Sequence, residues 1–75
     1  MEVESMKVLA AVLSIGLAAG PVAVAEAWIA TKAMEAIGRN PSVSNDIFSR
    51  MVVAMAITES TAIYSLVISL LILFV

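Results

Sequence analysis

Apolar residues form two long stretches in this chain, and polar residues gather between them. The first stretch begins at Val8, and the second runs from Met51 to Val75 with a single ionisable acid, Glu59. A membrane-spanning helix needs about 20 mostly apolar residues, and both stretches meet that length. The pattern therefore predicts an all-α fold, a transmembrane hairpin of two helices that uses the whole chain, 1–75.

Turn-forming residues set the expected boundaries of the two helices. Gly38 is typical of a helix C-terminus, and Pro41 is typical of the turn that follows. Ser44, Asn45 or Asp46 is expected to cap the second helix, because each side chain accepts hydrogen bonds from free N–H groups. The expected elements are helix 1 over about 5–38, a loop over about 39–43 and helix 2 over about 44–75.

Two features interrupt the regularity of the first predicted helix. Pro21 removes one backbone hydrogen bond inside the span, which favours a local kink. Closer to the loop, Lys32 and Glu35 are spaced to form an i,i+3 ion pair. At ~1.5 Å per residue this helix is about 50 Å long, so its polar end is expected to project beyond the membrane.

Composition agrees with a membrane protein and narrows the function classes. The 75 residues are 63% hydrophobic and 13% charged, with a mean hydropathy of +1.11, and a chain this short cannot bury a sizeable soluble core. There is no cysteine or histidine, which excludes disulfides and disfavours zinc sites and most nucleophile–base pairs. Four cations and a net charge of −2 make nucleic acid an unexpected partner.

The segment Ala23-Val24-Ala25 resembles the small-residue cleavage site of a signal peptide. In the leading residues, however, Glu2 and Glu4 outnumber Lys7, whereas a signal peptide begins with a basic region. Helix-favouring sequence also continues past that site to Gly38. We therefore expect the mature chain to keep both helices.

Small residues recur along the first helix at a spacing that keeps them on one face. Gly16 and Gly20 form a G-x-x-x-G pair, which is typical of close helix–helix approach in lipid. The stripe consists of Gly16, Gly20, Ala23, Ala27 and Ala30. Because one hairpin contains one copy of this helix, the stripe predicts packing against the same helix of identical subunits, in a closed homo-oligomeric ring.

Charges at the helix ends predict the orientation of the hairpin. Lys32, Arg39 and Arg50 lie toward the loop, against Lys7 near the N-terminus. Under the positive-inside rule, the loop is cytoplasmic and both termini lie outside, in a cell inner membrane.

Acidic residues inside the membrane spans are the main candidates for function, since burying a carboxylate in hydrocarbon is costly. Glu59 lies within the polar stretch 58–61 of the second helix, 15 residues after Ser44, and Glu26 lies 14 residues before Asn40. At equal rise per residue, the two carboxyl groups of an antiparallel hairpin lie at nearly the same depth. No lysine or arginine lies at that depth, so the neutralising charge must be a proton or a metal cation.

The hydroxyl groups near Glu59 favour a cation. Ser60 and Tyr64 share one stripe at i,i+4, which is expected to lie next to Glu59, and carboxyl and hydroxyl oxygens are ligands for a hard cation. Two carboxylates with one Na⁺ still carry a net charge of −1, which is costly in lipid. The hypothesis is therefore one Na⁺ and one proton per site, with Glu26 as the protonated acid.

Each hydroxyl also has a purely structural interpretation. Tyr64 is of a type that anchors helices at the membrane interface. Ser60 and Thr61 are able to donate hydrogen bonds back to helix carbonyls. Ser65 and Ser69 are expected to be packing hydroxyls between helices rather than ligands.

The two helices, the small-residue stripe, the Arg39-Asn40-Pro41 loop and the mid-span acid together resemble the c-subunit, the rotor-ring proteolipid, of rotary ATP synthases. The pattern Glu-Ser-x-x-x-Tyr within 59–68 is similar to the second helix of the Na⁺-binding members of that family. The resemblance extends from about Ala10 to Phe74. It implies a ring of identical hairpins, non-catalytic by itself, that rotates within membrane lipid and is coupled to ATP synthesis or hydrolysis.

The resemblance also implies roles for individual residues. Glu59 matches the ion-carrying carboxylate, which exchanges its ion at the a-subunit of the stator. Ser60 matches a hydroxyl ligand and the backbone carbonyl of Ile57 a second ligand. Tyr64 matches a residue that hydrogen-bonds the carboxylate, and Thr61 matches one that holds a bound water.

The loop and the first helix complete this comparison. Arg39, Asn40 and Pro41 match the loop that docks the central stalk. Many Na⁺-binding members have Gln where Glu26 stands, and a Glu there resembles a two-carboxylate variant of the site. Ala and Val replace much of the family's glycine-rich stretch, as in 22–25. Two alternatives stay open: the same rotor coupled to H⁺, and a small regulatory membrane hairpin that oligomerises through its first helix.

Overall fold

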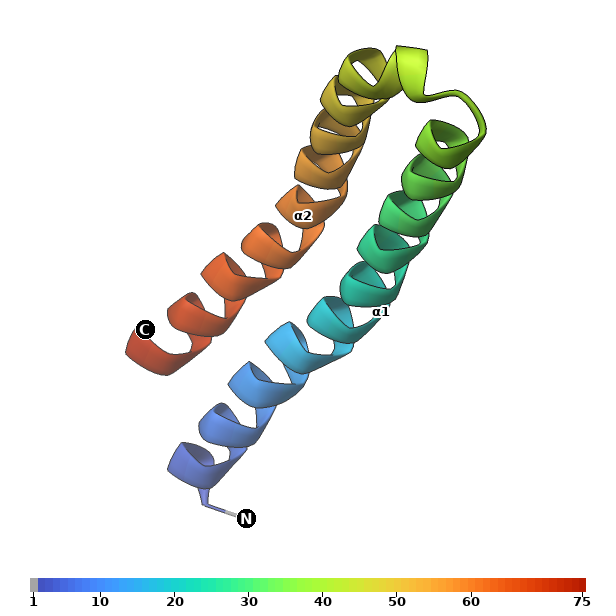
Figure 1. Cartoon of the computed structure of the whole chain (residues 1–75). Helices are drawn as coiled ribbons and strands as arrows, with labels where there is room; N and C mark the ends of the chain where they lie inside the picture. The colour runs from blue at the N-terminus through green and yellow to red at the C-terminus, as the bar shows by residue number, and fades with distance from the viewer. Residues whose placement is uncertain (1) are drawn as a thin grey trace.

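Two long antiparallel helices make up the structure, a computed structural model that describes residues 2–75 (Figure 1). Helix α1 spans Val3–Arg39, a short 3-10 turn η1 spans Pro41–Val43, and helix α2 spans Ser44–Phe74. The hairpin is 58 Å long, and the start of α1 and the end of α2 both lie at the end opposite the turn. Both helices are long and apolar enough to cross a membrane. The predicted all-α hairpin is confirmed.

The end of α1 differs from the expected stop at Gly38. The helix continues through Gly38, and no glycine among residues 2–75 has a positive φ. It ends at Asn40, where the backbone turns to φ −145° and ψ 84° while the Asn40 N–H still donates to the Ala36 carbonyl at 3.1 Å. Asn40 precedes Pro41, and a residue before proline is disfavoured from helical geometry. The proline, rather than the glycine, therefore ends the helix.

The start of α2 also differs from the prediction. None of the three expected capping side chains caps this helix, whose N-cap is Val43 without a side-chain hydrogen bond. The turn η1 supplies backbone partners instead, because the Ser44 N–H donates to the Pro41 carbonyl. Asp46, in the first turn, accepts from Arg50 Nε at 3.2–3.3 Å. Backbone hydrogen bonds in the 3-10 turn thus replace the expected cap.

Small side chains form the seam between the helices. The buried residues of α1 are Ala11, Val22 and Ala33, spaced by 11 residues, and those of α2 are Ala62 and Ser69. Eleven residues correspond closely to three helical turns, so this spacing keeps one face of a nearly straight helix against its partner.

Hydroxyl groups reinforce this seam near the chain ends. Ser69 Oγ is buried and donates to the Ala11 carbonyl at 2.8 Å, and Ser14 Oγ donates to the Ser65 carbonyl at 3.5 Å. Hydrogen bonds between membrane helices contribute on average ~0.6 kcal/mol each. The interpretation of Ser69 as a packing hydroxyl is confirmed, while Ser65 contributes its backbone carbonyl.

The middle and the loop end of α1 carry the two features predicted for them. Pro21 lies inside the helix, and α1 bends gently along its length (Figure 1). Lys32 Nζ pairs with Glu35 Oε2 at 3.6 Å, as the i,i+3 spacing predicts.

The small-residue stripe faces away from α2. Gly16, Gly20, Ala23 and Ala27 are exposed, and Ala30 is half-buried. A Cβ built at Gly16 or Gly20 meets no atom within 4 Å. The hairpin therefore does not need these glycines, and any requirement for them comes from a surface outside it.

Replacing Gly20 by valine is expected to leave the hairpin folded and to prevent ring assembly. The side chain meets open space within one hairpin, but it separates two helices that pack through a G-x-x-x-G pair. Helical content by circular dichroism stays at the wild-type level, and the particle size in detergent falls from ring to smaller species. Leu17→Phe, at a 72% exposed position outside the stripe, is the control and keeps full-size rings. Full-size rings from Gly20→Val contradict a role for the stripe in assembly.

Candidate ion-binding site

Two carboxyl groups meet across the hairpin. Glu26 is half-buried on α1, Glu59 is exposed on α2, and their side chains lie close to each other. The depth match predicted by counting from the turn is therefore present in the structure. A hydrogen bond between two carboxyl groups requires that one of them hold a proton, since ionised carboxylates only accept.

No basic side chain neutralises this pair. The two ion pairs within residues 2–75 are Lys32–Glu35 and Arg50–Asp46, both nearer the loop. Lys32 lies six residues beyond Glu26, and Arg50 nine residues before Glu59. At 1.5 Å per residue these cations are about 9 and 13 Å away along the helices. The acids must therefore take up a proton or a cation from outside the chain.

Two further oxygens lie side by side on α2. Ser60 Oγ donates a hydrogen bond to the Ile57 carbonyl within the same helix. The predicted hydrogen bond from Ser60 back to a helix carbonyl is therefore present. The hydroxyl directs its proton to that carbonyl, and its lone pairs stay available to a cation. Ile57 itself is 67% exposed. The Ile57 carbonyl and the Ser60 hydroxyl are thus two hard oxygens in contact on an exposed part of α2.

The other hydroxyls near Glu59 behave differently from one another. Thr58 is half-buried, and its Oγ1 donates to the Ala54 carbonyl at 2.9 Å. Thr61 is exposed, and no back-bond to a helix carbonyl involves it within residues 2–75. Tyr64 is 70% exposed. Sequence reasoning did not single out Thr58 as the residue that bonds back to its own helix, although its i−4 spacing to Ala54 permits this bond.

One hairpin does not gather all the predicted site residues. Successive residues turn by about 100° around an α-helix, so Ile57 and Glu59 leave α2 on nearly opposite sides. Ser60 and Tyr64 share a stripe, but on the continuous helix α2 it is turned about 100° or more away from Glu59, so the predicted position of the stripe next to Glu59 is wrong. The structure therefore brings together two pairs, Glu26 with Glu59 and Ser60 with the Ile57 carbonyl, and leaves Tyr64 and Thr61 apart. Within residues 2–75 no three acidic side chains cluster in a way that would hold a metal.

The loop forms the tip of the hairpin (Figure 1). Arg39, Asn40 and Pro41 are all exposed there. Ser42 Oγ donates to Asn40 Oδ1 at 2.6 Å, which fixes the Asn40 side chain at the turn. The tip therefore presents a cation and a fixed amide on a rigid turn.

A family model for the C-subunit of ATP synthase matches residues 9–72. The chain belongs to this family. The ATP synthase c-subunit of Petrotoga mobilis is 45% identical over 69 residues, which cover 92% of this chain and 72% of that protein. The c-subunit of Dehalococcoides mccartyi is 41% identical over 75 residues, covering 100% and 99%. That of Mycoplasma genitalium is 42% identical over 59 residues, covering 79% and 58%.

Membership in this family decides the general role of the hairpin. The chain is a membrane-embedded, ion-translocating component of the ATP synthase rotor ring, and it is not itself catalytic. This excludes the alternative of a small regulatory hairpin. The contact between Glu26 and Glu59 is then the feature from which the transported ion has to be inferred.

Proposed function

We propose that this rotor-ring protein carries Na⁺, and that Glu59 is the carboxylate that holds it. The observation that supports this proposal is that the Glu26 and Glu59 side chains lie close together at a depth where the chain has no lysine or arginine. A proton carrier needs a single acid in apolar surroundings. A second carboxyl at the same place adds oxygen ligands that a proton does not use.

Charge balance supports one proton alongside each Na⁺. Two ionised carboxylates and one Na⁺ leave a net charge of −1, which is costly in lipid. With Glu26 protonated and Glu59 ionised, the loaded site is neutral, and the protonated acid is able to donate to its neighbour. Because two acids in contact share their titration, the proton belongs to the pair as much as to Glu26.

The remaining ligands follow from hard-cation chemistry. Na⁺ favours oxygen donors, and the Ser60 hydroxyl and Ile57 carbonyl are in contact on an exposed part of α2. Thr61 holds a water at the site, and Tyr64 donates a hydrogen bond that steadies the Glu59 carboxylate. Because these residues point in different directions on one hairpin, a complete site forms only when a second copy of the chain packs beside the first. Ring assembly and ion binding are therefore linked.

The path of the ion follows from these positions. Loading neutralises Glu59, so the site can face lipid, and rotation then carries it to the stator, where the ion exchanges. Lys32, Arg39 and Arg50 near the loop outnumber Lys7 at the other end, which supports a cytoplasmic loop and external termini under the positive-inside rule. The exposed tip at 39–41 docks the central stalk on that side.

Proton transport by the same ring is the second candidate. The observation in its favour is the proximity of Glu26 and Glu59, because a shared proton satisfies both carboxyls without a metal ion. In that case Glu26 and Ser60 hold a protonated Glu59 in place, and Na⁺ has no part in the cycle.

ATP-driven transport separates the two candidates. We expect the complete ATP synthase, reconstituted in lipid vesicles with this ring, to take up radioactive Na⁺ when ATP is added. A protonophore leaves this uptake intact, because it discharges only proton gradients. Uptake of protons that is independent of Na⁺ and abolished by the protonophore contradicts the Na⁺ assignment and supports the second candidate.

A further inference from the structure

The side of α1 opposite the small-residue stripe has a shallow groove. The groove has a volume of ≈ 460 Å³, and Trp28, which is 66% exposed, forms part of its wall. Ala25 and Ile29 each lie two residues from Ala27 of the stripe, which places them about 160° around the helix from it. The lining residues are Ala25, Trp28, Ile29 and Lys32. The groove and the stripe therefore lie on nearly opposite sides of one helix.

Ring symmetry requires two different surfaces of the chain to meet. When the same patch of two copies packs together, a two-fold axis relates them and the assembly closes as a dimer. A ring of more copies forms head to tail, so each copy presents one surface to the copy before it and another to the copy after it. If the stripe of α1 is one of these surfaces, its counterpart on the next α1 lies on the other side of that helix. The groove is on that side.

The groove and the stripe also match in depth. Rotation about an axis normal to the membrane keeps each residue at the same depth in every copy. Ala27 and Ala30 of the stripe fall within the residue range of the groove, 25–32. The Trp28 side chain leans toward the N-terminal end of its helix, which brings it level with Ala27 of the next copy. A large aromatic side chain on one surface thus faces a small methyl group on the other.

The polarity of the groove suits an uncharged partner. Among its lining residues the charged one is Lys32, whose Nζ pairs at 3.6 Å with Glu35. Glu35 does not line the groove and lies three residues nearer the loop. A surface of glycine and alanine can therefore cover the groove without leaving its cation unpaired.

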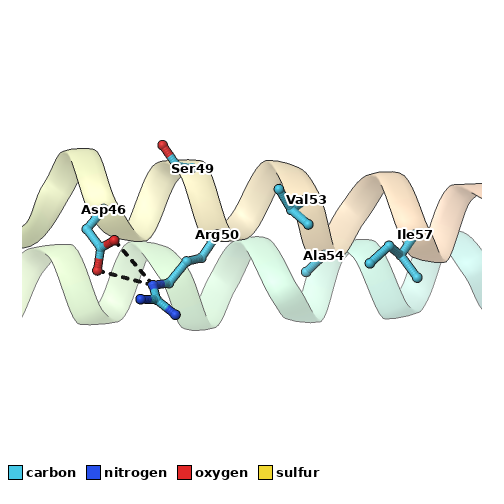
Figure 2. Close-up of a pocket in the computed structure, with 6 residues that line it drawn as sticks. All are labelled: Asp46, Ser49, Arg50, Val53, Ala54 and Ile57. Atoms are coloured by element: carbon cyan, nitrogen blue, oxygen red, sulfur yellow. Dashed lines mark hydrogen bonds and ion pairs between the residues drawn. The ribbon is translucent and has the colours of Figure 1, made fainter.

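A groove on α2 is less suited to the stripe (Figure 2). Both members of an ion pair line it, since Arg50 Nε donates to Asp46 at 3.2–3.3 Å. Its other lining residues include Val53 and Ile57, whose branched side chains are 58% and 67% exposed. Small residues favour close approach of two helix backbones, and these branched side chains hold a neighbouring helix further away. The contact of α1 with α1 is therefore favoured.

We propose that the α1 groove of each hairpin receives the small-residue stripe of α1 from the next copy, with Trp28 packed on Ala27 of that copy. Glu26 borders the stripe, about 40° around the helix from Ala30. Docking therefore brings Ala25 of the groove beside Glu26 of the next copy, from which it differs by one residue in depth. The groove thus covers one side of the neighbouring acid pair, whether the ring carries Na⁺ or H⁺.

Disulfide cross-linking tests this contact, because the chain has no cysteine of its own. Rings that carry Trp28→Cys together with Ala27→Cys are purified, checked for full size and oxidised. Within one chain these two positions are adjacent, with Cα atoms about 3.8 Å apart, whereas a disulfide usually needs about 4.4–6.8 Å. Bonds between successive copies are therefore expected, and most chains should run as a ladder of dimers and longer species on a non-reducing gel.

Single and double variants identify the surface that fills the groove. Trp28→Cys alone repeats one position on the same side of every α1 and is expected to give no ladder. Trp28→Cys with Ile57→Cys joins positions of similar exposure, 66% and 67%, that lie two residues to the loop side of Glu26 and Glu59. This pair is also expected to give no ladder. A ladder from it would overturn the proposal, because α2 of the next copy would then occupy the groove.

A second pair keeps the tryptophan in place. Ala25→Cys with Ala23→Cys introduces small side chains on opposite sides of α1 and is also expected to form the ladder, so the test does not depend on replacing Trp28. Full-size rings in which neither this pair nor Trp28→Cys with Ala27→Cys cross-links would overturn the proposal and leave the groove to lipid.

Discussion

Rings that carry Glu59→Gln are expected to assemble at full size and to transport no ion. The glutamine keeps the shape of the side chain, and Glu59 is exposed on the single hairpin, so packing is little disturbed. It cannot ionise, so it offers no charge to hold Na⁺ and no proton to release at the stator. ATP synthesis driven by an ion gradient in vesicles should fall to the background of vesicles without a gradient.

The matched control for Glu59→Gln removes another acid of the chain. Glu35 pairs with Lys32 nearer the loop, and its side chain is 48% exposed. Exposed ion pairs of this type contribute only ~0–1 kcal/mol. Glu35→Gln rings should therefore keep gradient-driven synthesis. Substantial synthesis by Glu59→Gln rings would show that another group carries the ion.

Glu26→Ala is expected to weaken Na⁺ binding by about 10- to 100-fold, since a hydrogen bond to a charged group contributes ~1.5–3 kcal/mol. Glu26 reaches Glu59 from α1, so its loss removes both an oxygen and the neighbour that steadies the ionised acid. Proton transport through Glu59 should persist, because that reaction needs one acid. Na⁺ binding to purified rings, measured by isothermal calorimetry, checks the first expectation.

Glu26→Gln refines the assignment of the proton. The amide keeps an oxygen and gains its own donors, so the loaded site is neutral without an extra proton. At a pH where both acids of the empty site are ionised, wild-type rings should take up one proton with each Na⁺, whereas Glu26→Gln rings should load Na⁺ without one. Na⁺ affinity unchanged in Glu26→Ala would remove Glu26 from the site.

Much of the fold could be predicted from two apolar runs in the sequence and from the positions of two acids relative to the turn. Apolar runs of membrane-spanning length determine the two helices, and nearly equal counts from the turn, 14 and 15 residues, bring Glu26 and Glu59 to nearly the same depth. The ends of the helices were less predictable. Gly38 is a good stopping residue, but Pro41 acts on Asn40 and ends the helix there.

The candidate site shows a different limit of sequence reasoning. Residue spacing places Ser60 and Tyr64 on one stripe, and it turns that stripe away from Glu59. In the proposed site, the ligands would therefore lie on surfaces that meet only in the assembled ring. Arg50 contributed only to the predicted orientation of the hairpin in the membrane. Its i,i+4 spacing from Asp46 could also have predicted the ion pair that the structure contains.

The most direct test of Na⁺ binding at Glu59 is its reaction with a hydrophobic carbodiimide. The reagent modifies protonated carboxyl groups within apolar surroundings, and mass spectrometry of purified rings measures the modified fraction. At constant pH, millimolar Na⁺ is expected to slow labelling of Glu59, and the same concentration of K⁺ or choline is not. Labelling that ignores Na⁺ and declines only as the pH rises would contradict the account and identify the ring as a proton carrier.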